Sequence, residues 1–206
     1  MQFQKLGDLL GLPKDKVLDF GLKLDLSQNN LSLAKHFEKN SSFVGLILGS
    51  SWPSRFWMPK YYAELIVSLK EKYGIRSVLI GGPGEREFAD IVLNDPLLDN
   101  QQEYFLDLVG MTKLSELPWL FSQMKFAIGS DSGPMHIAAA SGIRVISLWG
   151  STSPLRSAPW GSEDLLVEAT EPCSPCYKKV CPGFGTACMR SITPSRISGK
   201  IESLIG

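Results

Sequence analysis

The chain has 206 residues, 44% of them hydrophobic, which is enough for one domain with a buried core and a short accessory segment. Basic and acidic residues balance at 21 each, so the sequence lacks the basic surface that nucleic-acid binding requires. No apolar run approaches the roughly 20 residues that cross a bilayer, and residues 1–8 lack the layout of a signal peptide. These features exclude nucleic acid as a partner and predict a cytoplasmic protein.

The first 40 residues predict a connector rather than a domain, with one short helix near 31–39. From residue 43 onward, apolar strand patterns alternate with amphipathic helical patterns. We expect strands at 43–48, 77–80, 105–109, 125–129 and 144–150, and helices at 60–73, 85–93, 114–124 and from 134 onward. Such alternation is typical of a parallel, doubly wound α/β sheet.

Beyond residue 150 the sequence loses this periodicity. Five prolines lie between 154 and 182, and only residues 194–205 again predict a helix. The expected organisation is therefore a connector at 1–40 and one Rossmann-like domain at 41–206. This domain includes a cysteine-rich loop at 171–190 and the closing helix at 194–205.

Polar clusters follow each predicted strand, and in an open parallel sheet ligands bind at those strand ends. The clusters supply glycine, serine, threonine, one arginine and two acids, and they lie at 49–55, 81–85, 110–112, 130–136 and 150–154. We expect these loops to form one cleft with the chemistry of a nucleotide site.

The segment 130–136 points most strongly to a ligand, because it places the N-terminus of a helix, where backbone N–H groups bind anions, directly after a buried strand. Ser132 and Gly133 are expected to address phosphate. Phosphate would repel Asp131, which is expected to accept hydrogen bonds from a sugar or to act only as a helix cap. The helix dipole favours a neutral ring at His136, bound to phosphate or backbone oxygen, with a purely structural histidine as the alternative.

Arg55 and Glu85 complete the set of charged candidates. Arg55 would neutralise a diphosphate and stabilise it as a leaving group, or it is an ordinary solvated loop charge. Glu85, after the glycine-rich run 81–84, would accept hydrogen bonds from a ribose diol, or it complements the dipole of the helix that it begins.

Several of these segments resemble the signature of the ADP-heptose:lipopolysaccharide heptosyltransferases, glycosyltransferase family 9. They are 49–59 (GSSWPSRFWMP), 130–140 (SDSGPMHIAAA) and 148–150 (LWG) followed by Pro154. The cysteine spacing from 173 to 188 resembles a segment of the heptosyltransferase II type. The resemblance implies a GT-B architecture of two Rossmann-like domains, with this chain similar to the C-terminal, donor-binding one. It also implies inverting, metal-independent transfer of heptose from ADP-heptose to the inner core of lipopolysaccharide.

The resemblance also assigns donor contacts. Arg55 takes the place of the family's usual lysine at the diphosphate and, as stabiliser of the leaving group, is the one residue with a catalytic role. The other implied contacts are Ser50 and Ser51 with phosphate, Glu85 with ribose, Met111 and Thr112 near adenine, and Asp131, Ser132, Gly133 and His136 with the sugar and diphosphate.

The family further implies an N-terminal domain that carries an aspartate general base and holds the acceptor, the lipopolysaccharide core or lipid A. This chain opens in what resembles the interdomain connector, and no carboxylate in it fits the role of the base. We therefore expect donor binding without efficient transfer and no required cofactor. For the complete enzyme we expect peripheral association with the cytoplasmic face of the inner membrane.

Two other functions are compatible with the residues. A nucleotide-sugar epimerase on the same fold would use Asp131, Glu85 and His136 as its acid and base candidates. The second alternative is a nucleotide-binding module without catalysis.

The chain's four cysteines lie in one segment, as Cys173, Cys176, Cys181 and Cys188. A cytosolic setting favours metal or free thiols over disulfides, and four thiols in short loops suit tetrahedral zinc better than an iron–sulfur cluster. Lys178, Lys179 and Arg190 suggest a different interpretation, a basic flap that meets an acidic acceptor or a membrane surface. A solvated loop with ordinary charges is the third.

Overall fold

The computed structural model describes residues 31–37, 41–182 and 186–206. The first described element, α2 (Leu31–Ala34), coincides with part of the short helix expected near 31–39. The rest of the predicted connector lies outside the described residues.

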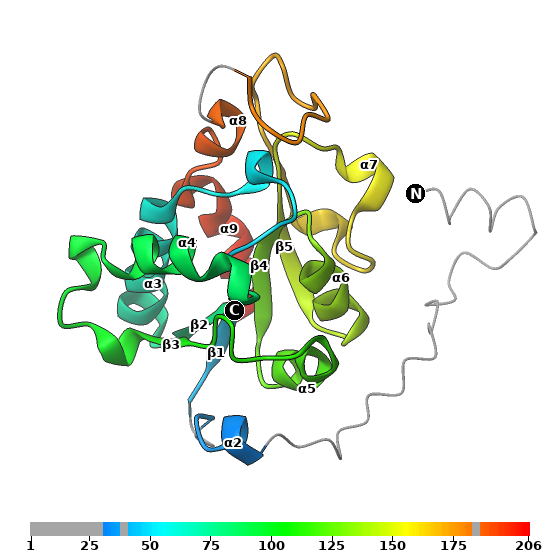
Figure 1. Ribbon diagram of the computed structural model, residues 1–206. Coiled ribbons are helices and arrows are strands. Elements are labelled where there is room, and N and C mark those ends of the chain that lie inside the picture. Colours follow the sequence, from blue (N-terminus) through cyan, green and yellow to red (C-terminus); the bar gives the residue numbers. More distant parts are fainter. Residues whose placement is uncertain (1–30, 38–40, 183–185) are drawn as a thin grey trace, which may run out of the picture.

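The sheet of the described residues has six strands, all parallel, in the order β3-β2-β1-β4-β5-β6. The strands are β1 (Phe43–Ile47), β2 (Arg76–Ile80), β3 (Phe105–Asp107), β4 (Phe126–Ser130), β5 (Arg144–Trp149) and β6 (Leu166–Glu168). The chain winds outward from β1 to β3, returns to β4 beside β1, and winds outward again on the other side (Figure 1). The expected doubly wound α/β fold is confirmed, and the strand order reverses between β1 and β4.

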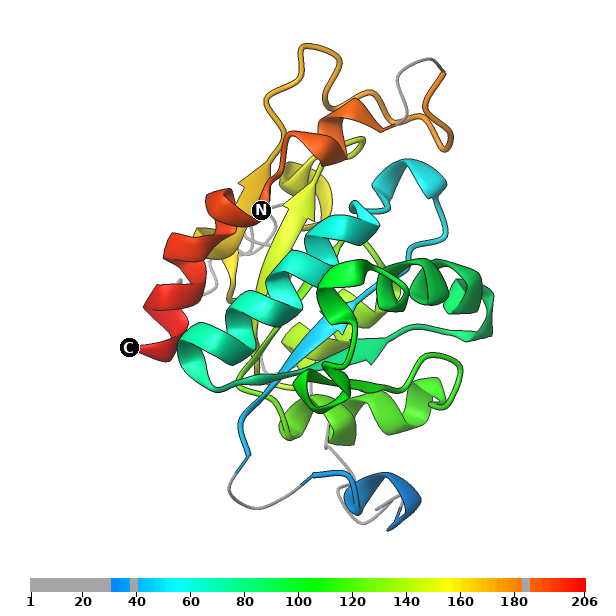
Figure 2. The same ribbon diagram turned by 90° about the vertical axis from the view of Figure 1, so that its left-hand side faces the viewer.

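Helices cover both faces of this sheet (Figure 1 and Figure 2). One face is covered by α3 (Pro59–Tyr73), α4 (Arg86–Leu93) and α9 (Pro194–Ile205), and the other by α2, α5 (Leu117–Ser122) and α6 (Gly133–Ala140). Two short helices, α7 (Pro154–Ser157) and α8 (Ala187–Arg190), follow β5 and precede α9.

The central strand β1 is buried on both faces, as its apolar composition predicts. Val44 and Leu46 point into the core beneath α3 and α9, whereas Phe43 and Ile47 point into the core beneath α5 and α6. This alternation follows from the two-residue period of a strand. Two buried layers therefore hold the strand ends, and the loops that follow them, in fixed positions.

The structure departs from the expected elements where the local pattern is short. The predicted strand at 105–109 ends at Asp107, and the predicted helix at 114–124 divides into a 3₁₀ turn (Leu114–Glu116) and α5. Strand β6 was not predicted, since three residues cannot display a period; its pairing with Ser147 and its neighbours on β5 defines it.

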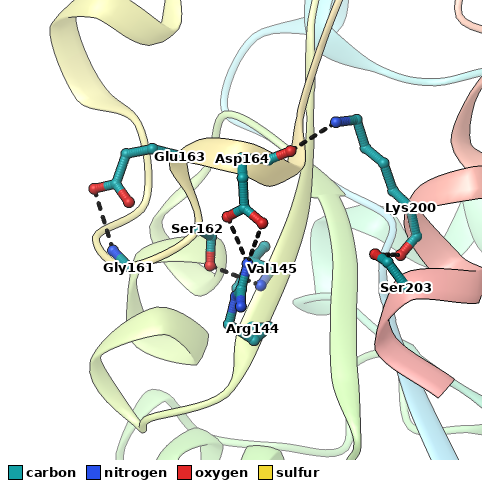
Figure 3. A network of polar contacts seen from close by, with 8 residues as sticks. All are labelled: Arg144, Val145, Gly161, Ser162, Glu163, Asp164, Lys200 and Ser203. Atoms are coloured by element: carbon teal, nitrogen blue, oxygen red, sulfur yellow. Dashed lines mark hydrogen bonds and ion pairs between the residues drawn. The ribbon is translucent and has the colours of Figure 1, made fainter. Parts of the chain in front are cut away.

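A polar network joins β5, the turn before β6, and α9 at the sheet edge opposite the polar loops (Figure 3). The Arg144 guanidinium donates to both carboxylate oxygens of Asp164, and Lys200 Nζ donates to the backbone oxygen of Asp164 at 2.7 Å. Ser162 Oγ accepts from the backbone N–H of Val145. The network fixes the end of the chain against the sheet and leaves the other edge to the candidate site.

Candidate functional site

The loops after β1 and β4 meet at the point where the strand order reverses. Ser50 Oγ donates to the backbone oxygen of Asp131 at 2.9 Å, and Arg55 Nη1 donates to the same oxygen at 3.1 Å. The sequence places Ser50 and Asp131 81 positions apart, and the fold brings them together because β1 and β4 are neighbours. The crevice beside such a reversal is where open α/β sheets bind ligands.

Arg55 is held on both sides. Its guanidinium carbon lies 4.1 Å from the centre of the Trp52 ring, and Nη1 lies 3.3 Å from Asp131 Oδ2. Its Nε is buried and has no hydrogen-bond partner among the described residues. The structure thus excludes a freely solvated loop charge at this position, and one guanidinium donor remains unused.

Asp131 does not cap a helix with its side chain. Its Oδ2 accepts a hydrogen bond from Thr152 Oγ1 at 2.9 Å, in addition to the contact with Arg55, and the residue is only 9% exposed. The N-cap of α6 is Ser132. The capping interpretation of Asp131 is therefore wrong. Thr152 was absent from the predicted site residues; its place in a polar loop after β5 was the only signal in the sequence.

Polar groups at the N-terminus of α6 lack hydrogen-bond partners among the described residues. Ser132, although it is the N-cap, makes no capping hydrogen bond, and its buried Oγ has no partner among the described residues. A Cβ built at Gly133 would meet no atom within 4 Å, so there is open space beside this turn. The first backbone N–H groups of a helix also lack intrahelical acceptors. This end of α6 therefore presents several unused donors.

His136 lies in the first turn of α6, and the residue is exposed. Desolvation by the surrounding protein lowers the pKa of His136 below its ordinary value, and the negative charge of Asp131 opposes this shift only in part. The structure thus favours the neutral ring that the helix dipole predicts.

Glu85 connects the loop after β2 to the loop after β1. Its Oε2 accepts from the backbone N–H of Gly82 at 2.7 Å, and its side chain lies where a Cβ on Gly49 would be, since that Cβ would come within 2.2 Å of Glu85 Cγ. Glu85 ends a 3₁₀ turn directly before α4. One carboxylate oxygen, Oε1, has no hydrogen-bond partner among the described residues.

The remaining predicted donor contacts are less closely gathered. Ser51 is exposed in the loop after β1. Met111, which is 61% exposed, and Thr112 follow β3, which β2 separates from β1. They lie at the same edge of the sheet, farther from α6 than Ser50 and Arg55 are along the strand order.

Residues 171–182, here called the strap, cross above the carboxyl ends of the strands (Figure 1). Ser54, in the loop after β1, contacts both the strap and the loop after β5. Its Oγ donates to the Lys178 backbone oxygen at 2.7 Å and lies 2.9 Å from Ser151 Oγ. The backbone N–H of Tyr177 donates to the Ser151 backbone oxygen at 2.7 Å. The strap is thus bonded to the loops that carry Arg55 and Thr152.

No disulfide joins the four cysteines: Cys173 is exposed, Cys176 and Cys181 are partly buried, and Cys188 is buried in α8. Burial raises the pKa of the Cys188 thiol. Within residues 31–37, 41–182 and 186–206, no three histidine, cysteine or acidic side chains are grouped so as to hold a metal ion. The zinc interpretation of the cysteine segment, one of the three given above, finds no support among the described residues.

No helix in the described part of the chain has both the length and the apolar character needed to cross a membrane.

Comparison with known proteins gives a consistent result. The chain is 27% identical over 194 residues to lipooligosaccharide heptosyltransferase 2 of Campylobacter jejuni. The aligned residues cover 93% of this chain and 58% of that protein. It is 29% identical over 191 residues to lipopolysaccharide heptosyltransferase 2 of Salmonella typhimurium, covering 89% of this chain and 53% of that protein. The chain thus spans about half the length of the curated relatives that it matches.

Among solved structures, that of Escherichia coli ADP-heptose lps heptosyltransferase II matches with a TM-score of 0.69 and 25% identity, over 85% of this chain and 50% of that chain. A glycosyltransferase family 9 structure from Veillonella parvula, 20% identical, shares the fold with a TM-score of 0.68 over 87% of this chain and 51% of that one. The family model described as glycosyltransferase family 9 (heptosyltransferase) matches residues 2–185. The chain therefore belongs to glycosyltransferase family 9.

Proposed function

We propose that this chain binds the nucleotide-sugar donor ADP-heptose and forms the donor-binding part of a GT-B heptosyltransferase of lipopolysaccharide or lipooligosaccharide synthesis. Its family membership supports this proposal, as do the names of the relatives it matches, which are heptosyltransferases. The matched Escherichia coli enzyme carries ADP-heptose in its own name, ADP-heptose lps heptosyltransferase II.

The observation that carries the proposal is the set of unused donors around the N-terminus of α6. The Ser132 hydroxyl and Arg55 Nε are buried without partners among the described residues, and leaving such groups unpaired costs about 1–3 kcal/mol each. A diphosphate supplies acceptors for both, and its charge is stabilised by the helix N-terminus and by a fixed arginine. Ser50 and Ser51 in the loop after β1 would add hydroxyl donors to the phosphates.

The neighbouring carboxylates suit the rest of the donor. Asp131 Oδ1 and Glu85 Oε1 have no hydrogen-bond partner among the described residues, and each can accept from a hydroxyl group. Asp131, beside α6, would bind the heptose, and Glu85, beside Gly49, would bind the ribose. Met111 and Thr112, one strand farther out, would lie near the adenine.

In an inverting transfer, the acceptor hydroxyl attacks the sugar while the nucleoside diphosphate leaves with its bonding electron pair. Arg55 and the α6 N-terminus would stabilise the charge that develops on the leaving diphosphate. A general base and the surface that holds a lipopolysaccharide acceptor would come from the remainder of a complete enzyme. We therefore expect this chain to bind the donor without transferring heptose efficiently.

Isothermal titration with ADP-heptose, ADP and UDP-glucose tests the proposal. We expect ADP-heptose and ADP to bind and UDP-glucose to bind more weakly, and the Ser132→Ala variant to lose affinity for ADP severalfold. Ser203→Ala, in an exposed position of α9, is the matched control and should bind as the unmodified chain does. Absence of binding to any ADP compound would contradict the donor assignment.

A further inference from the structure

Thr152 makes one buried hydrogen bond to the carboxylate of Asp131. The two residues are 7% and 9% exposed, and Thr152 Oγ1 lies 2.9 Å from Asp131 Oδ2. Arg55 Nη1 approaches the same oxygen at 3.3 Å. One oxygen of the carboxylate thus has two donors, while the other, Oδ1, has no partner among the described residues.

The loop that carries Thr152 is fixed on both sides of it. Ser151 bonds through its hydroxyl to Ser54 Oγ and through its backbone oxygen to the N–H of Tyr177. Ser153 caps α7 by accepting from the backbone N–H of Leu155 at 3.3 Å. With both neighbours bonded in this way, the Thr152 hydroxyl has a defined position relative to β4.

A carboxylate has two nearly equivalent oxygens, and its terminal torsion has a broad, roughly two-fold distribution. The long contact with Arg55 alone does not fix this torsion, since a guanidinium can donate to a carboxylate over a range of orientations. A second donor at a fixed position restricts the torsion. Thr152 therefore sets the direction in which the remaining oxygen of Asp131 points toward a ligand.

We infer that Thr152 is a positioning residue that sets specificity for the sugar of the nucleotide-sugar donor, by holding Asp131 so that Oδ1 accepts from a sugar hydroxyl. This inference rests on the proposed function, because it takes Asp131 to face the sugar. It concerns the sugar alone: the phosphates would lie with Arg55 and Ser132, to which Thr152 makes no hydrogen bond. Loss of the Thr152 hydroxyl should therefore weaken ADP-heptose binding and leave ADP binding nearly unchanged.

The test is isothermal titration of ADP-heptose and of ADP into the full chain and its Thr152→Val and Thr152→Ser variants. Valine keeps the shape and removes the hydroxyl, and serine restores the hydroxyl. We expect the ratio of the two affinities to fall roughly tenfold in Thr152→Val, as for loss of a hydrogen bond to a charged group, and to recover in Thr152→Ser. Thr170→Val, at an exposed position after β6, is the control for a threonine-to-valine change.

Two results would overturn the inference while leaving the proposed function intact. One is an unchanged affinity ratio in Thr152→Val; the other is an equal loss for both ligands, which a purely structural role would cause. If the unmodified chain bound neither ligand, the proposed function itself would fail, and the inference with it.

Discussion

Arg55 and Asp131 illustrate how much a single residue's role depends on its partners. Both were predicted as site residues from their positions after strands, and the fold brings them within 3.3 Å of each other. The hydrogen bonds of Asp131 with Ser50 and Thr152 were not predictable, because they join residues that are 81 and 21 positions apart in the sequence. Residue type and strand-end position predicted candidates; only the path of the loops determines which side chains bond.

His136 should make the free energy of unfolding depend on pH. Its pKa is lowered in the folded protein, so between that pKa and the ordinary value of 6.5 the unfolded chain binds more protons than the folded chain. The free energy of unfolding should therefore rise with pH through this window and become independent of His136 above it. The His136→Gln variant cannot take up this proton and should lack that rise.

Urea unfolding between about pH 5 and pH 8 measures this dependence. His36, the chain's other histidine, supplies the control, because His36→Gln should leave the rise at His136 in place. Equal pH dependence in His136→Gln and the unmodified chain would show that His136 is not responsible for it.

At the scale of elements, prediction succeeded where a segment is long and strongly patterned. The predicted helix at 60–73 corresponds to α3, and the central strands lie within one residue of their expected starts. The prediction failed for β6, α7 and α8, which are short and lie after residue 150, where the sequence loses its alternating pattern. The strap, although prominent in the sequence through its cysteines, takes its position from hydrogen bonds to distant loops.

The loops after β1 and β2 approach each other closely at Gly49 and Glu85. A methyl group on Gly49 would lie 2.2 Å from Glu85 Cγ, so Gly49→Ala should push Glu85 away and reduce the free energy of unfolding by about 1–3 kcal/mol, as overpacking does. If that contact is the cause, the Gly49→Ala and Glu85→Ala changes should not be additive, because removing the Glu85 side chain makes room for the methyl group.

Urea unfolding of both single variants and the double variant gives this coupling. Gly84→Ala is the control, since a Cβ there meets no atom within 4 Å and the backbone does not have a positive φ; a change of no more than about 0.5 kcal/mol is expected. Additive effects of the Gly49 and Glu85 substitutions would contradict the proposed contact between the loops.

In the whole molecule, the candidate site and the polar network that holds α9 lie at opposite ends of the strands. The carboxyl edge carries loops with unused donors, and the amino edge carries the Arg144, Asp164 and Lys200 network that holds α9 (Figure 3). The alternation of elements predicted the doubly wound class, but not the position of β6 or the way α9 completes the core. The position of α9 depends on contacts of its apolar face with α3 and β5, and no local sequence pattern encodes these contacts.

Ile197 tests the role of α9 in the stability of the whole fold. Its side chain is fully buried in the core that α3, α9 and β1 share, so Ile197→Ala should lower the free energy of unfolding by about 2–5 kcal/mol. Ile91, which is 55% exposed on α4, offers the same substitution without a buried side chain, and Ile91→Ala should cost far less. Since α9 lies away from α6 and the loops around it, ADP affinity should be unchanged in both variants under conditions where they remain folded.

Tryptophan fluorescence during urea unfolding distinguishes loss of the whole fold from loss of α9 alone. Trp57 is buried in the core beneath α9 and donates to the Ile192 backbone oxygen, whereas Trp149 is buried in the core on the other face of the sheet. The strands contribute side chains to both cores, so the two cores should unfold together in a single transition. Ile197→Ala should move this transition to a lower urea concentration. Two separate transitions, with only the first moved by the substitution, would mean that α9 and the core beneath it unfold independently, and that the candidate site does not depend on them for stability.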